Sequence, residues 1–199
     1  MEPVELRPIH RLTGAEAFHT SGSALGFDVL DFWRWSSSDL VGNVLRSRLA
    51  EYLVARALGL AAGCRVEWDA CDLRGPDGLT IEVKSAAYVQ SWAQTRASRI
   101  VFGIQPAYGW DAATNTSLDE RCRSAGVYVF CLLHHADAAT LDPLDLDQWT
   151  FYVLSTAVLD QKLPQQKTIT LSALRTLEPI ECGYDGLAGA VWKAAGIPR

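Results

Sequence analysis

The sequence has no long hydrophobic run. Its longest apolar stretch, at 127–133, is far shorter than the roughly 20 residues that a helix needs to cross a bilayer, so we expect no membrane span. The first thirty residues lack a basic start followed by an apolar run, which predicts no signal peptide. No CxxC pair occurs among the five cysteines, and we therefore interpret them as reduced thiols of a cytoplasmic protein.

Several catalytic signatures are also missing. There is no GxSxG string and no phosphate-binding P-loop, and the four histidines are dispersed, which argues against a catalytic triad. Cys122 and Cys131 precede His134 and His135, but this spacing does not match a common zinc finger. We therefore expect no zinc site at these residues.

What the sequence contains favours a folded globular protein. Of its 199 residues 49% are hydrophobic and seven are tryptophan, and no repeat or long linker divides them, so we expect one domain over 1–199. The net charge is −5 but unevenly spread: residues 39–100 carry eight Arg/Lys against seven Asp/Glu, and residues 101–160 carry two against eight. A polyanion would therefore contact the first of these regions.

One long amphipathic helix is indicated over 39–58. The run Ser36–Asp39 is a helix-start signal, apolar residues follow at helical spacing, and Gly59 suits the stop. Residues 1–37 before it look like an irregular lead-in that contains an aromatic cluster (Phe27, Phe32, Trp33 and Trp35).

The remaining pattern predicts a sheet core of α/β or α+β class, at about 39–160, followed by a helical extension at 172–199. Residues 105–125 are polar and predicted to form a surface excursion. The other expected elements are an extended segment at 64–85, a short helix around 86–95, strands at 99–104, 126–133, 149–155 and 168–170, and helices around 172–177 and 184–195.

A sharp turn lies inside the extended segment. If Pro76–Gly78 form a type I turn closed by a left-handed glycine, Arg74 faces Thr80 and Asp72 lies directly opposite Glu82. Side chains alternate across a strand, so the hairpin acquires an apolar and a polar face. The apolar face holds Cys71, Leu73, Leu79, Ile81 and Val83, and the polar face holds Asp72, Arg74, Thr80, Glu82 and Lys84.

The opposed carboxylates of Asp72 and Glu82 suggest a metal site. Directly opposite residues have Cβ atoms about 4.5–5.5 Å apart, and like charges there are destabilising unless something compensates them. A divalent cation such as Mg²⁺ or Mn²⁺ prefers such oxygen ligands, and Lys84 lies on the same face. The alternative is an exposed strand face with ordinary solvated charges, on which Lys84 offsets one carboxylate.

The pattern of Asp72, nine residues, and then Glu82-Val83-Lys84, preceded by a helix bearing Glu51, resembles the PD-(D/E)XK nuclease superfamily. The strings LAEYLVARALG, WDACDL and IEVKSAAYVQSW also look like those of bacterial members whose role is undefined. The resemblance covers about residues 39–105. It implies a restriction-endonuclease-like mixed sheet core flanked by helices.

The resemblance also implies roles for particular residues. Asp72 and Glu82 would ligate Mg²⁺ or Mn²⁺ through side-chain oxygens, and Val83 through its backbone carbonyl. Lys84 would position and activate the attacking water, and Glu51 would serve a second metal or an outer-shell water. Gln90 and Ser85 resemble residues near the substrate in some members. From the residues alone, Arg46, Arg48, Arg96 and Arg99 are candidates to contact phosphates, and Trp92 is a candidate to contact DNA.

The sequence departs from the family pattern in two places, because the separate strand expected before the one that carries Asp72 is hard to fit into 60–70 and the proline expected before Asp72 is missing. Ala70-Cys71 stands where a proline is expected before Asp72, and Asp69 competes with Asp72 as the first carboxylate. We expect a metal-dependent nuclease that hydrolyses DNA phosphodiesters, acting as an endonuclease. The alternative is a non-catalytic nucleic-acid-binding or structural subunit with the same fold. DNA versus RNA, sequence specificity and a homodimeric state stay open.

Overall fold

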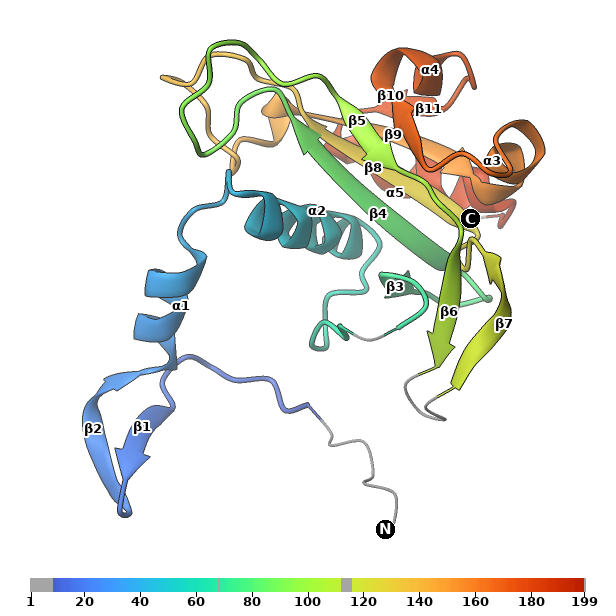
Figure 1. Cartoon of the computed structure of the whole chain (residues 1–199). Coiled ribbons are helices and arrows are strands. Elements are labelled where there is room, and N and C mark those ends of the chain that lie inside the picture. The colour runs from blue at the N-terminus through green and yellow to red at the C-terminus, as the bar shows by residue number, and fades with distance from the viewer. Residues whose placement is uncertain (1–8, 68, 112–115, 199) are drawn as a thin grey trace.

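The computed structural model describes residues 9–67, 69–111 and 116–198. A five-stranded sheet forms its centre (Figure 1). Its strands, in spatial order, are β11 (Ile180–Cys182), β9 (Trp149–Ser155), β8 (Val127–Leu133), β4 (Thr80–Ala87) and β3 (Leu73–Arg74). The sheet is mixed, because β4 pairs with β8 in parallel and all other pairs are antiparallel.

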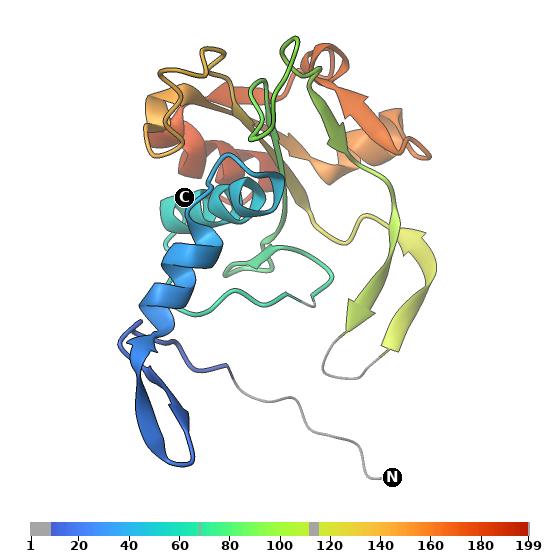
Figure 2. The same cartoon turned by 60° about the vertical axis from the view of Figure 1, so that its left-hand side comes forward.

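Helices and a small second sheet cover the two faces. The helices α2 (Asn43–Ala57) and α5 (Tyr184–Ala195) pack on one face (Figures 1 and 2). The other face is covered by the two-stranded sheet of β5 (Val101–Gly103) and β10 (Thr168–Thr170) with α3 (Thr156–Lys162) and α4 (Leu171–Arg175). This arrangement confirms the predicted α/β class. None of the helices in the described part of the chain is long and apolar enough to span a bilayer.

The strands β8 and β9, in the middle of the sheet, are covered on both faces. All seven residues of β8 are buried, and its odd-numbered and even-numbered side chains contribute to the two separate cores. A strand covered on both faces needs a continuous apolar run rather than an alternating one, which is the pattern of VYVFCLL. The strands predicted at 126–133 and 149–155 are thereby confirmed to within one residue.

The predicted helix at 39–58 is confirmed as α2, but it begins later. The Asp39 carboxylate accepts hydrogen bonds from the amides of Val41 and Gly42, and this turn delays the helix to Asn43. The helix ends as predicted at Gly59, whose φ is 72°. The amide of Gly59 donates to the Arg56 carbonyl and that of Leu60 to the Ala55 carbonyl, as in a Schellman motif.

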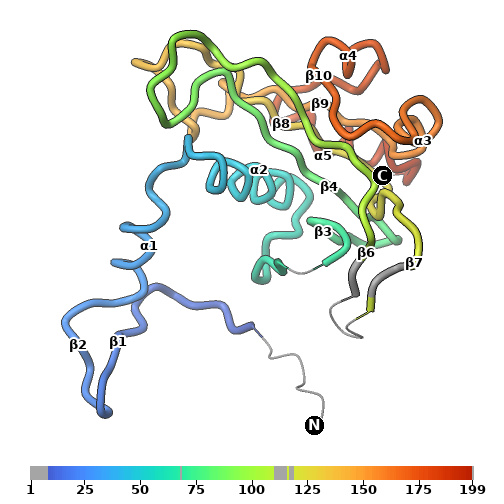
Figure 3. Tube along the Cα trace, viewed as in Figure 1, coloured from blue at the N-terminus to red at the C-terminus, as the bar shows by residue number. Residues whose placement is uncertain are grey.

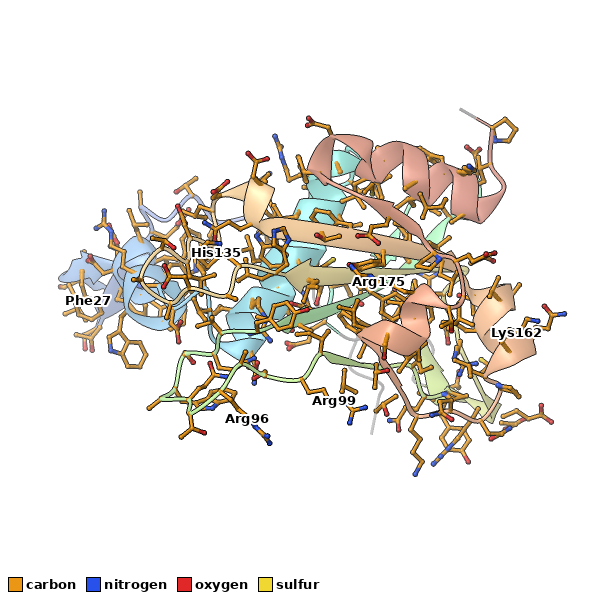
Figure 4. All side chains as sticks on the ribbon, turned by 90° about the horizontal axis from the view of Figure 1, so that it is seen from above. Phe27, Arg96, Arg99, His135, Lys162 and Arg175 are labelled. Atoms are coloured by element: carbon orange, nitrogen blue, oxygen red, sulfur yellow. The ribbon has the colours of Figure 1, made fainter. Side chains whose placement is uncertain are left out.

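The prediction of an irregular lead-in holds for residues 9–16, which form no helix or strand, and was wrong for residues 17–37. The latter form a hairpin of β1 (Ala17–Thr20) and β2 (Ser23–Asp28) followed by the helix α1 (Val29–Ser37). The Asp28 and Asp31 side chains form a capping box that starts this helix without help from the body of the protein. The hairpin and α1 project as an arm, with Phe27 at the end far from Lys162 (Figures 1 and 4).

One further prediction was wrong beside the sheet. Residues 86–95 do not form a helix, because Ala86 and Ala87 continue the parallel ladder with Leu132 and Leu133 and the chain then bends. The polar segment predicted as a surface excursion at 105–125 contains two strands that the sequence did not indicate, since β6 (Ala107–Asp111) and β7 (Thr116–Cys122) pair as a projecting hairpin (Figures 1 and 2). The two strands pair with each other through backbone hydrogen bonds. Such pairing needs few apolar side chains, so the sequence shows little hydrophobic pattern there.

The path of the chain places the predicted site beside α2. After α2 the chain loops beneath the helix, turns through β3 and enters β4, which runs alongside α2 (Figure 3). The face of β4 toward α2 carries Ile81 and Val83, which share a core with Leu53 and Val54. The helix and the hairpin are therefore fixed to each other by apolar packing, and so are the polar residues that they carry.

Candidate functional site

The pairing of β3 with β4 has the predicted register. Leu73 lies opposite Ile81 and Arg74 opposite Thr80, and the Gly75 amide donates to the Leu79 carbonyl at 2.8 Å. Continued by one residue, this register brings Asp72 opposite Glu82.

The turn that closes the hairpin differs in type from the prediction. The Leu79 amide donates to the Pro76 carbonyl at 3.1 Å, and both residues between them have positive φ, 57° at Asp77 and 75° at Gly78. Positive φ at both central positions is typical of a type I′ turn rather than type I, and the twist of type I′ matches that of paired strands. The register is unaffected, because the Gly75 amide still pairs with the Leu79 carbonyl as the predicted hairpin requires.

The two faces of the hairpin are separated as predicted. Cys71, Leu79, Ile81 and Val83 are buried, and Leu73 is half-buried against the same core. On the other face Asp72, Thr80, Glu82 and Lys84 are half-buried and Arg74 is exposed. The charged residues therefore lie at a partly desolvated surface, where their interactions are stronger than on an open strand.

The Asp72 side chain hydrogen-bonds to the backbone of β4 at the edge just beyond β3. Its Oδ2 accepts a hydrogen bond from the Val83 amide at 2.7 Å, in the place where a longer β3 would have supplied a carbonyl. The N–H and C=O of one strand residue point to the same side, so the Val83 carbonyl also faces the edge where Asp72 lies. This is the carbonyl expected to act as a ligand.

Glu82 and Lys84 form an ion pair on one strand, with the Nζ and Oε1 atoms 2.5 Å apart. Burial raises the pKa of Glu82; the Lys84 ammonium partly offsets this rise, whereas the charges of Asp72 and Glu51 add to it. Three carboxylates thus repel one another at this position, which favours a cation between them.

Glu51 extends toward the hairpin from α2 and is only 8% exposed. Its carboxylate accepts two hydrogen bonds from Arg65, at 2.5 Å from Nε and 3.2 Å from Nη2. This bond, with the Glu51 charge, raises the pKa of Arg65 against the opposing effect of burial. Glu51 and Asp72 line one cavity of about 360 Å³, so the helix carboxylate and the predicted first carboxylate of the hairpin border the same space.

The competing carboxylate, Asp69, is engaged elsewhere. Arg74 donates to both of its oxygens, at 2.6 and 2.9 Å, and this pairing lowers the pKa of Asp69. Asp69 borders the same cavity as Asp72, but only Asp72 adjoins the strand edge at Val83.

The oxygen donors suit a hard divalent cation in kind. Among the described residues, however, no three His, Cys, Asp or Glu side chains gather closely enough to hold a metal ion. Each carboxylate has its own partner instead: Asp72 the Val83 amide, Glu82 the Lys84 ammonium and Glu51 the Arg65 guanidinium. The chemistry of the site therefore fits a metal, and its carboxylates are held by two ion pairs and one hydrogen bond to the backbone.

Arg46 is a residue whose place the sequence prediction missed. It is 4% exposed, so it neither contacts phosphates nor lies on a solvated face, and burial lowers its pKa. Its guanidinium donates to Ser85 Oγ at 3.1 Å and to Gln90 Oε1 at 3.3 Å. The predicted substrate-side residues are thus brought together by this arginine. Its position four residues before the buried Ala50, on the apolar face of α2, was the signal available.

The other predicted contact residues lie on the surface. Arg48 borders the carboxylate cavity and makes a long ion pair, 3.7 Å, with Glu67. Trp92 is exposed on the loop that follows β4, and so are Arg96 and Arg99, which Figure 4 labels. That loop borders a hollow separate from the carboxylate cavity, so these three residues and Arg48 do not belong to one pocket.

Fold and site together define a mixed α/β protein with an Asp, a Glu and a Lys on one edge hairpin and a helix carboxylate beside them. Comparison with family models matches residues 30–173 to bacteriophage T4 endonuclease IV. The match spans most of the chain and includes all of these residues, and the chain belongs to this family. No match was found among curated proteins. Membership of an endonuclease family supports a nuclease role.

Proposed function

We propose that the protein is a metal-dependent endonuclease that hydrolyses DNA phosphodiester bonds at the β3–β4 hairpin. The observation that carries the proposal is the register of this hairpin, which sets Asp72 opposite Glu82 with Lys84 on the same face. The endonuclease family match supports it independently of any geometry.

The metal proposed is Mg²⁺ or Mn²⁺. Asp72 and Glu82 would hold it through side-chain oxygens and Val83 through its carbonyl, and Glu51 would hold a second ion or an outer-shell water. When bound, such an ion supplies a Lewis acid that neutralises charge on the phosphate oxygens. Burial raises the pKa of Glu82, and repulsion from Asp72 and Glu51 adds to the rise. A cation between the carboxylates would relieve this repulsion, which supports this choice of ligands.

Lys84 performs the part of the chemistry that needs a proton donor and a compact positive charge. Its ammonium has three donors and uses one on Glu82. The remaining donors orient the attacking water and stabilise the charge that grows on the phosphate. Glu82 in turn holds the ammonium in place, so the two residues act as one unit.

The order of elements supports membership of the PD-(D/E)XK superfamily and its restriction-endonuclease-like fold. A helix with a buried glutamate precedes a hairpin with the Asp and the Glu-x-Lys pair, and the second hairpin strand lies inside a mixed sheet. The DNA substrate, a cytoplasmic location and a homodimeric state belong to the same proposal.

The test is cleavage of supercoiled plasmid by purified protein in Mg²⁺, in Mn²⁺ and in EDTA. We expect nicking and linearisation with either metal and none in EDTA. Lys84→Ala, purified in parallel, should lose this cleavage, whereas Lys162→Ala, an exposed lysine on α3, should retain it. Equal cleavage by the wild type and Lys84→Ala would show that the activity does not come from this site.

One observation favours a second candidate function, a nucleic-acid-binding subunit without turnover. Every carboxylate of the site is already engaged, and the described residues hold no ready group of three ligands. Binding of an oligonucleotide without cleavage in any metal would support this alternative. Binding with metal-dependent cleavage would exclude it.

A further inference from the structure

A second, smaller hollow adjoins the carboxylate cavity. It encloses about 190 Å³ and lies where α2 ends. Arg11 and Tyr52 border both hollows, so these two side chains stand between the carboxylates and the smaller space. The described residues that line the smaller hollow are Arg11, Tyr52, Arg56, Gly59, Ala61 and Ala62.

The charge of this hollow differs from that of the rest of the protein. Among the described residues that line it, two are arginines and none is Asp or Glu, although the chain as a whole carries −5. In the carboxylate cavity, by contrast, Arg65 and Arg74 are each paired with an acidic residue. The smaller hollow therefore holds positive charge that no carboxylate in its lining neutralises.

The two arginines keep most of their donors for a ligand. Arg11 donates from Nη1 to the Ala62 carbonyl at 3.0 Å, which fixes its guanidinium at the rim and leaves its other N–H groups unused by that contact. Arg56 has no hydrogen-bond or ion-pair partner for its side chain among the described residues. A planar guanidinium with free donors is the group best suited to grip a phosphate in bidentate fashion.

The helix end itself does not oppose an anion strongly. A helix C-terminus carries partial negative charge, which acts mainly within the last turn. Here the last carbonyls already accept hydrogen bonds: Val54 from Leu58, Ala55 from Leu60 and Arg56 from Gly59. The small residues Gly59, Ala61 and Ala62 also leave room beside the two guanidinium groups.

Tyr52 connects this hollow to the carboxylate cavity. Its side chain is 52% exposed, and Arg48 and Arg56 lie four residues before and after it, so the three follow one face of α2. Arg48 borders the carboxylate cavity and Arg56 the smaller hollow. A polyanion that follows this face meets the carboxylates, an aromatic ring and then the second pair of arginines.

We propose that Arg11, Tyr52 and Arg56 form a phosphate subsite, which holds a phosphate of the nucleic-acid strand beside the one that is cleaved. The inference rests on the proposed nuclease function and adds to it a second point of attachment. Arg11 and Arg56 bind the phosphate oxygens, and the Tyr52 ring contacts the nucleoside between the two hollows. The subsite fixes where the strand lies relative to Asp72 and Glu82.

The test compares Arg56→Gln with Arg34→Gln, a matched control on α1 whose arginine is exposed and makes only a long ion pair with Asp31. Binding of a fluorescent oligonucleotide is measured by anisotropy in EDTA over a range of salt. Arg56→Gln should weaken binding by about three- to tenfold and reduce the slope of log K against log salt by about 0.7–0.9, the effect of one lost phosphate contact. Arg34→Gln should change neither. Equal behaviour of the two variants overturns the subsite.

Two further measurements identify the ligand and the role. Inorganic phosphate should compete with the oligonucleotide better than chloride at equal ionic strength in the wild type and lose this advantage in Arg56→Gln, because Arg56 is proposed to grip phosphate oxygens; an advantage that is unchanged in Arg56→Gln overturns that assignment. With metal present, Arg56→Gln should raise KM and leave kcat unchanged, as expected when an interaction with the bound strand is lost equally in ground and transition states. Equal melting temperatures of the variant and wild type show that the fold is kept.

The outcomes separate this inference from the proposed function. Cleavage by the wild type with no effect of Arg56→Gln refutes the subsite and leaves the nuclease assignment in place. Binding that depends on Arg56 without cleavage in Mg²⁺ or Mn²⁺ supports the subsite and refutes the nuclease. Absence of any binding by the wild type refutes both.

Discussion

The Asp72 carboxylate and the Val83 amide are joined by a hydrogen bond of 2.7 Å at the edge of the central sheet. Asp72 comes immediately before the two residues of β3, so its side chain continues the pairing that the short strand leaves incomplete. One residue thus has both a structural contact, with the strand amide, and a place in the lining of the cavity. Its two roles should be separable by substitution.

Asp72→Asn is expected to retain the fold and lose activity. An amide oxygen still accepts from the Val83 amide but is a far weaker ligand for Mg²⁺, so kcat/KM for plasmid cleavage should fall by at least ~100-fold. Asp72→Ala should lose activity equally and also lower the free energy of unfolding by about 0.5–1.5 kcal/mol, because the hydrogen bond is gone. Urea denaturation and cleavage rates measure both effects. Full activity of Asp72→Asn would remove Asp72 from the site.

Asp69→Asn tests the competing first carboxylate. The Asp69 pair with Arg74 lies partly at the surface, so its loss should cost at most about 1 kcal/mol of stability and change cleavage less than about threefold. The measurement is the cleavage rate of Asp69→Asn beside that of Asp72→Asn under identical conditions. If instead Asp69→Asn is inactive and Asp72→Asn active, the assignment of the two residues must be exchanged.

Glu82 should make metal-free stability depend on pH. Burial raises its pKa in the folded state above the ordinary value of 4.5, so the folded protein binds this proton more tightly than the unfolded chain. The resulting stabilisation is present below the unfolded pKa and is lost as the pH rises through the folded pKa. Glu82→Gln should therefore lose less stability than the wild type between pH 4 and pH 7 in EDTA. Unfolding free energies at several pH values test this, and parallel curves for the two proteins would contradict it.

Arg46 is expected to be essential for stability rather than for contact with the substrate. Arg46→Met removes the donors that hold Ser85 and Gln90, and leaves their oxygens without this partner in a buried region. The free energy of unfolding should fall by about 2–4 kcal/mol. Arg48→Met, two residues along α2 and exposed, should change it by less than about 0.5 kcal/mol. Similar urea midpoints for both variants would show that the buried arginine contributes little.

The elements predicted well are those whose side chains face a core. The continuous apolar runs of β8 and β9 require burial on both faces, and the helical spacing from Ala50 to Val54 requires one buried stripe, so sequence and structure agree. The β3–β4 register also followed from the sequence, because the Asp77-Gly78 turn leaves few ways to close the hairpin. The polar face of the site followed from that register.

The elements missed are those that the core does not specify. The arm formed by β1, β2 and α1 has no buried residue in its helix, and β6 and β7 pair mainly with each other. Their formation depends on caps and backbone pairing, which leave a weak pattern in the sequence. Arg46 was placed wrongly for the opposite reason: it occupies a core position although its residue type is usually exposed.

The shortness of β3 has a consequence for how the site forms. Only two residue pairs join β3 to the sheet, at its outer edge, whereas seven join β4 to β8. The segment carrying Asp72 can therefore detach by local opening while the centre of the sheet stays folded. Amide hydrogen exchange at Val83 should then be faster than at Val129 in the middle of β8. Asp72 would therefore leave the site before the protein unfolds globally. Hydrogen exchange at the Val83 amide would reveal this local opening.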